Sequence, residues 1–117
     1  MKMPKPTEAD RERFASLVPD HPDVEIKPMF GQLGAFVNGN MFMGLFGSDV
    51  GVKLPADERE QLLTEPGSGP FGPPDRPMSG YVCLPASWSG PDTEPWITAA
   101  YTHVAELPAK TKKRAPG

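Results

Sequence analysis

Residues 24–54 constrain the fold most strongly, because apolar side chains recur there at every second position between tight turns. Glu25 and Lys27 alternate with apolar neighbours, as expected for a strand that buries one of its faces. Asn38-Gly39 is a strong hairpin signal, since both residues tolerate a positive φ angle. Gly47-Ser48-Asp49 provides another short turn. This pattern predicts an antiparallel meander of four strands, at 24–30, 33–37, 41–46 and 50–54.

Helical segments flank the predicted meander, and proline or glycine punctuates each of them. The helix starts are marked by Thr7, by Pro55, and by Asp92 or Thr93, and the ends by Pro19, Pro66-Gly67 and Pro108. A fifth strand is predicted at 81–84, between the last two helices. The order α-β-β-β-β-α-β-α favours a two-layer α+β fold, with the helices packed on one face of an antiparallel sheet.

The segment 66–80 is predicted to be an irregular loop, because nine of its fifteen residues are proline or glycine. The predicted strands also carry large apolar groups on both faces, at Phe36-Val37 and at Met41-Phe42-Met43. The sheet face away from the helices therefore needs cover. We expect a two-fold homodimer through that face or through an edge strand. The alternative is that the 66–80 loop folds back and Phe71 covers the same patch.

The charge is unevenly distributed along the chain. Four of the twelve basic residues lie in the last eight positions: Lys110, Lys112, Lys113 and Arg114. Residues 1–109 then carry eight basic and fifteen acidic side chains, a net charge of −7. An acidic body argues against direct nucleic-acid binding, because phosphate contacts need lysine or arginine. We expect a folded domain at 7–108, a flexible N-terminus at 1–6 and a disordered basic tail at 109–117.

The residues that most often perform chemistry are few and scattered. His21, Cys83 and His103 show no spacing that links them, so the sequence predicts no catalytic site, no metal site and no cofactor. A single cysteine cannot form an internal disulfide, which is typical of a reducing compartment. The first residues lack the apolar run of a secretory signal, and no apolar stretch is long enough to span a bilayer. We therefore expect a cytoplasmic, non-enzymatic protein that does not contact the membrane.

Several short motifs occur in a characteristic order along the chain. They are Lys27-Pro28-Met29-Phe30-Gly31, Gly34 to Gly39, Met41 to Leu45, and Arg76-Pro77-Met78 followed by Gly80-Tyr81-Val82. In this order the chain resembles the N-terminal domain of the TfoX/Sxy family, from about Thr7 to Pro108. Gln32 stands where the family motif often has a second glycine. The resemblance implies a two-layer α+β fold and a regulatory or adaptor role. Named members of the family are cytoplasmic co-regulators of natural competence genes, which act with a cyclic-AMP-responsive transcription factor.

These observations favour a small module that acts by protein–protein interaction. The resemblance suggests a transcription factor as the partner. We expect the interaction surface to include Lys27, Met29, Phe30, Phe46, Arg76 and Met78. Arg76 has two interpretations, since it could tether the long loop or face the partner. The alternative function is a small-ligand-binding domain that uses a pocket beside the 66–80 loop.

Overall fold

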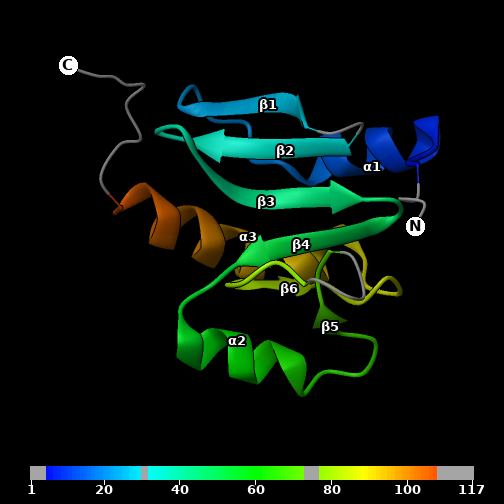
Figure 1. Cartoon of the computed structure of the whole chain (residues 1–117), viewed down its shortest axis with the longest axis vertical. Coiled ribbons are helices and arrows are strands. Elements are labelled where there is room, and N and C mark those ends of the chain that lie inside the picture. Colours follow the sequence, from blue (N-terminus) through cyan, green and yellow to red (C-terminus); the bar gives the residue numbers. More distant parts are fainter. Residues whose placement is uncertain (1–4, 30–31, 73–76, 108–117) are drawn as a thin grey trace.

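The computed structural model describes residues 5–29, 32–72 and 77–107, and Figure 1 shows their arrangement. The described residues form, in chain order, α1 (Glu8–Leu17), β1 (Val24–Met29), β2 (Gln32–Val37), β3 (Asn40–Phe46), β4 (Asp49–Lys53), α2 (Ala56–Leu63), β5 (Gly69–Pro70), β6 (Tyr81–Cys83) and α3 (Gly90–Ala105). The strands make one antiparallel sheet in the order β1-β2-β3-β4-β6-β5. The predicted α+β class is confirmed, as is the packing of helices against the sheet.

One short strand was not predicted. β5 lies inside the proline- and glycine-rich segment 66–80 and pairs with β6, with Gly69 opposite Cys83 and Pro70 opposite Val82. Two residues are too few to produce an alternating pattern, so sequence periodicity does not reveal this strand.

The last helix also begins earlier than predicted. Ser89, rather than Asp92 or Thr93, is its N-cap. The Ser89 backbone N–H and Oγ–H both donate to Asp92 Oδ2, at 3.1 and 3.0 Å. Asp92 therefore acts as the third residue of the helix, where a carboxylate satisfies the otherwise unpaired groups of the first turn.

The turns of the meander follow the sequence signals. Asn38 and Gly39 have φ angles of 54° and 79°, the positive values that a two-residue hairpin requires. Gly47, in the next turn, has a φ angle of 63°. Its backbone N–H donates to the side-chain oxygen of the buried Gln32 at 2.9 Å, so Gln32 on β2 stabilises the turn between β3 and β4.

A bulge in β3 determines which side chains enter the core. Ala35 pairs with Met43, but the next residue, Phe36, pairs with Met41, so Phe42 is the extra residue. Phe42 and Met43 consequently both point into the core and are fully buried. Met41 is left for the opposite face of the sheet. The three consecutive apolar residues in the sequence are therefore divided between the two faces.

The core lies between the sheet and the helices, and helix α3 packs directly against β2, β3 and β4. The fully buried side chains contributed by the helices include Phe14, Leu62, Ala100 and Val104. They contact the sheet residues of the same cluster: Ala35, Val37, Phe42, Met43, Leu45, Val50, Val52 and Val82. We call this side of the sheet the helical face and the other side the second face.

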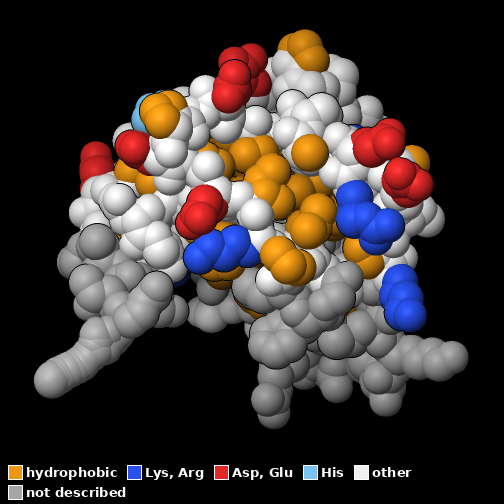
Figure 2. All heavy atoms as spheres, turned by 90° about the horizontal axis from the view of Figure 1, so that it is seen from above, with side chains coloured by type: hydrophobic (Ala, Val, Ile, Leu, Met, Phe, Trp, Pro, Cys, Tyr) orange, Lys and Arg blue, Asp and Glu red, His pale blue; other side chains and the backbone are white. Residues whose placement is uncertain are grey.

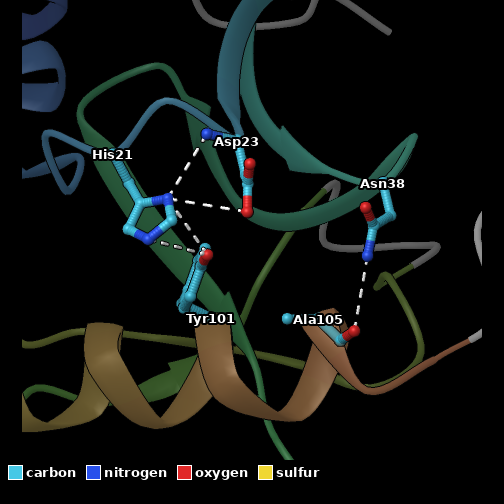
Figure 3. A network of polar contacts seen from close by, with 5 residues as sticks. All are labelled: His21, Asp23, Asn38, Tyr101 and Ala105. Atoms are coloured by element: carbon cyan, nitrogen blue, oxygen red, sulfur yellow. Dashed lines mark hydrogen bonds and ion pairs between the residues drawn. The ribbon is translucent and has the colours of Figure 1, made fainter.

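Polar contacts hold α3 to the loops around it (Figure 3). Asn38, in the turn between β2 and β3, donates from Nδ2 to the carbonyl oxygen of Ala105 at 3.4 Å. The Tyr101 hydroxyl lies 3.3 Å from Nδ1 of His21, in the turn before β1. The Tyr101 ring meets Phe42 edge to face, with the centroids 5.6 Å apart. The sheet and α3 are therefore joined at the end of the helix by both polar and aromatic contacts.

The predictions for the two termini lie partly or wholly outside the described residues. These are the flexible segment 1–6, of which residues 5 and 6 are described, and the basic tail 109–117. Within the described residues, no helix combines the length and the apolar character that crossing a membrane demands.

Candidate interaction surface on the second face of the sheet

A row of glycines crosses the second face of the sheet. Gly34 on β2 pairs with Gly44 on β3, and Gly44 pairs with Gly51 on β4. The row continues from Gly51 to Cys83 on β6, and from Lys27 on β1 to Gly34. Residues that are paired across strands point to the same face. At the centre of this face, three adjacent strands therefore carry no side chains on their backbone.

Phe71 and Met41 lie on the glycine row. A Cβ atom added to Gly51 would be 2.3 Å from Cγ of Phe71, much closer than any real contact, and one added to Gly34 would be 2.7 Å from the Met41 sulfur. The Phe71 ring is consequently buried, with 2% of its surface exposed. Phe71 therefore covers the centre of the second face, as in the alternative in which the 66–80 loop folds back, while side chains around it stay partly exposed.

Hydrogen bonds hold Phe71 in place from both sides. Its carbonyl oxygen accepts the Met78 backbone N–H at 2.8 Å. Ser68 donates from Oγ to the Cys83 carbonyl oxygen, also at 2.8 Å. Gly72, with a φ angle of 105°, supplies a backbone conformation next to Phe71 that favours glycine. The chain therefore returns over the sheet in a defined geometry.

Further large side chains surround Phe71. The Phe46 ring meets it edge to face at 6.4 Å, and the Tyr81 ring lies 6.1 Å from it. The Tyr81 hydroxyl donates to the Met41 carbonyl oxygen at 2.8 Å, beside the bulge in β3. We define the aromatic face as Phe36, Met41, Phe46, Phe71, Met78 and Tyr81. All of these except Phe71 are partly exposed.

Two lysines lie against rings of the aromatic face. Lys27 Nζ is 5.3 Å from the centroid of Phe36, and Lys53 Nζ is 5.7 Å from that of Tyr81, both within cation–π range. Lys27 also lies 3.6 Å from a carboxylate oxygen of Glu25. An apolar surface with positive groups beside it thus forms on a chain whose net charge is negative.

Of the six residues predicted for the interaction surface, the structure describes the side chains of three. Lys27, Phe46 and Met78 all lie at the aromatic face, Lys27 beside Phe36 and the other two beside Phe71. Phe30 and Arg76, and the side chain of Met29, lie outside the described residues. Sequence reasoning missed Phe36, Met41 and Tyr81 as members of this surface. The available signal was strand parity, since Phe36 lies two residues beyond Gly34 on the same face.

The one cysteine of the chain lies on the second face and is not activated as a nucleophile. Cys83 is buried beneath the 66–80 segment, and its thiol lies 3.3 Å from the Pro70 carbonyl oxygen. Burial, assisted by the nearby Asp49 carboxylate, raises the pKa of Cys83 to about 12. The thiol is therefore protonated at neutral pH, whereas a nucleophilic cysteine requires the thiolate. Among residues 5–29, 32–72 and 77–107, no group of three or more histidine, cysteine or acidic side chains could hold a metal ion.

The fold and this surface define a small α+β domain with one helical face and one aromatic face. Comparison with family models matches residues 12–104 to the TfoX N-terminal domain. The chain therefore belongs to the TfoX N-terminal domain family, as the sequence motifs indicated. No curated protein and no solved structure matched it in the corresponding searches.

Proposed function

We propose that this protein is a non-enzymatic regulatory or adaptor module, which binds another protein through its aromatic face. The observation that carries the proposal is the construction of that face. Phe71 is fixed on the glycine row, and partly exposed side chains pack around it. Membership of the TfoX N-terminal domain family supports a regulatory role.

The composition of the aromatic face suits a protein partner. Aromatic residues and methionine are enriched at protein interfaces, where they bury a large area at a low cost in side-chain entropy. Methionine adapts its shape to the surface that it meets. The Tyr81 hydroxyl and the backbone of Phe71 are already hydrogen-bonded, so part of the surface is ordered before binding.

The charges beside the aromatic face indicate the chemistry of the partner. Lys27 and Lys53 favour a partner that presents acidic groups around an apolar centre. The family suggests that this partner belongs to the transcription machinery. The small-ligand alternative gains no support here, because the Phe71 ring occupies the space above Gly44 and Gly51.

Capture from the native cytoplasm tests the proposal. The wild-type chain should retain a specific protein, with RNA polymerase and transcription-factor fractions probed first. Phe46→Ser and Met78→Ser should reduce that capture at least about tenfold, the loss expected when a central interface residue is truncated. Leu63→Ser is the matched control, since Leu63 is 46% exposed on α2, which contributes no residue to the aromatic face. Equal capture by wild type and by folded Phe46 and Met78 variants would contradict the proposal, as would a wild type that captures no specific protein.

A further inference from the structure

The outer edge of β1 is open along the described residues. β1 pairs with β2 on one side and ends the sheet on the other (Figure 1). In an antiparallel pair, the backbone groups of alternate residues point towards the partner strand and away from it. Pro28 has no N–H, and the Val24 N–H donates to the His21 carbonyl oxygen at 3.0 Å. The even-numbered residues therefore point away from β2, and Ile26 presents its N–H and C=O to the outer edge.

The same residue exposes an apolar side chain. Ile26 is 42% exposed on the helical face of β1, and Val24 beside it is half-buried. Between β1 and the end of α1 lies a hollow of about 320 Å³, which is lined by Ala15, Val18, Pro19, Val24 and Ile26 together with the polar residues Asp20 and His21. Figure 2, which views this end of the molecule, shows apolar side chains gathered at the centre with charged side chains around them. The exposed Ile26 side chain thus lies beside the open edge, next to a hollow of mixed apolar and polar lining.

The charged residues of β1 are arranged symmetrically around Ile26. Glu25 and Lys27 flank it and point to the second face, with Lys27 Nζ 3.6 Å from Glu25 Oε1. If two β1 strands pair antiparallel with Ile26 opposite Ile26, each Glu25 lies opposite a Lys27 of the other copy. A shift to the adjacent symmetric register would place Glu25 opposite Glu25, or Lys27 opposite Lys27. Directly opposed like charges are destabilising, so charge selects the Ile26-centred register.

We propose that the partner of this edge is a second copy of the chain, with the two β1 strands paired antiparallel about a two-fold axis at Ile26. The pairing joins two six-stranded sheets into one. It satisfies the backbone groups of Ile26 reciprocally, brings two exposed isoleucine side chains together, and sets Val24 opposite Pro28. Self-complementarity of this kind is what an interface on a two-fold axis requires. The aromatic faces of both copies stay uncovered, so this self-association goes beyond the proposed function.

The expected dimer is weak. Each copy contributes one six-residue strand and the hollow beside it. The area that each copy buries should therefore be smaller than the roughly 800 Å² per partner that stable complexes bury. Sedimentation equilibrium from about 10 µM to about 1 mM covers the range in which so small an interface dissociates. The measured mass should rise from 12.7 kDa towards twice that value across this series.

Charge reversal tests the register. Lys27→Glu and Glu25→Lys should each weaken the dimer at least about tenfold, because each places like charges opposite one another at two symmetric sites. The double variant Glu25→Lys/Lys27→Glu restores opposite charges at both sites. It should return the dissociation constant to within about threefold of the wild-type value. Both side chains are exposed, so the variants should keep the wild-type melting temperature.

Leu63→Ser serves again as the control, because it changes an exposed apolar residue on another element. A wild-type mass of 12.7 kDa at every concentration would overturn the proposal. So would a dimer that single charge reversals leave intact, or one that the double variant fails to restore, since either result would place the contact elsewhere.

Discussion

At the scale of single residues, Gly51 and Cys83 determine what the second face can do. Gly51 provides the bare backbone on which Phe71 lies, and Cys83 is its cross-strand neighbour. Burial beneath the 66–80 segment keeps the thiol protonated. Cys83, whose thiol is the most reactive type of side chain in the protein, therefore acts as a small buried group. Gly51 leaves space for the Phe71 ring.

Replacement of Gly51 by alanine should displace Phe71. The new Cβ would lie 2.3–2.7 Å from three carbon atoms of the ring, and overpacking of this kind costs about 1–3 kcal/mol. Urea denaturation measures the loss in unfolding free energy. Gly69→Ala is the matched control, since an added Cβ there meets no atom within 4 Å, and it should change stability by less than about 0.5 kcal/mol. Equal effects of the two substitutions would show that Phe71 does not rest on Gly51.

Cys83 should make the fold sensitive to alkali. Its pKa is about 12 in the folded chain, well above the ordinary value of 9.0, so the unfolded chain releases the proton first. The stabilisation is complete below pH 9 and is lost as the pH rises towards 12, by at most about 1.4 kcal/mol per pH unit. Cys83→Ser should flatten this fall when unfolding free energy is measured against pH. Some slope should persist, because burial also raises the pKa of Tyr81 to about 12. An unchanged slope in the serine variant would contradict the assignment.

At the scale of elements, the hairpin between β2 and β3 serves two purposes. Its turn reverses the chain, and Asn38 in that turn holds the end of α3 through the Ala105 carbonyl oxygen (Figure 3). Asparagine suits both tasks, since it tolerates the positive φ angle of 54° and carries a side-chain donor. The sequence predicted the turn from Asn38-Gly39 but not the contact with α3. The helix contact depends on residues 67 positions apart, which local patterns do not encode.

Substitutions of Asn38 can separate these two tasks. Asn38→Ala loses the side-chain bond and strains the backbone, so it should cost about 1.5–3 kcal/mol. Asn38→Gly loses the same bond but accepts the positive φ angle, so it should cost less than Asn38→Ala by about 1 kcal/mol. Thermal and urea unfolding measure both values. If the glycine variant is as stable as the wild type, the contact with α3 contributes nothing.

Within the 66–80 segment, the structure contains features that the sequence did not predict. The composition of this segment predicted an irregular loop, of which residues 66–72 and 77–80 are described, but β5 was not predicted and cover by Phe71 was only the alternative. The Phe71 ring has space there because Gly44 and Gly51 become neighbours across β3 and β4. In the sequence, each glycine of the row is typical of a turn or a bulge. Only the register of the paired strands places these glycines opposite one another. The order of the meander strands and helices, by contrast, follows from local periodicity and capping, and it was predicted correctly, although α3 begins earlier than its predicted start.

At the scale of the whole molecule, the charge distribution bears on the class of partner. The body up to residue 109 carries −7, whereas the last eight residues carry four basic side chains. The two lysines beside the aromatic face are far outnumbered by the fifteen acidic side chains of the body. The net field around the body therefore repels a polyanion, whereas the two lysines act locally, on acidic groups of a partner that contacts the aromatic face.

Nucleic-acid binding should accordingly depend on the tail. The full chain should bind duplex DNA weakly at low salt, and binding should vanish near physiological salt because few counterions are released. Removal of residues 109–117 should abolish the remaining signal in a fluorescence anisotropy titration. A mixed-sequence duplex compared at two salt concentrations provides the control. Tight, sequence-selective binding by the truncated chain would contradict this expectation, because it would show that the acidic body itself binds DNA.

The cover that Phe71 provides also has a consequence for the order of folding. The ring packs on Gly44 of β3 and Gly51 of β4, so it can dock only after those two strands have found their register. The hairpin with Asn38-Gly39 is local and can form early, whereas Phe71 joins it from 20 residues beyond Gly51. Contacts that form after the rate-limiting step slow unfolding without accelerating folding. We therefore expect Phe71 to affect the lifetime of the folded protein more than the speed with which it forms.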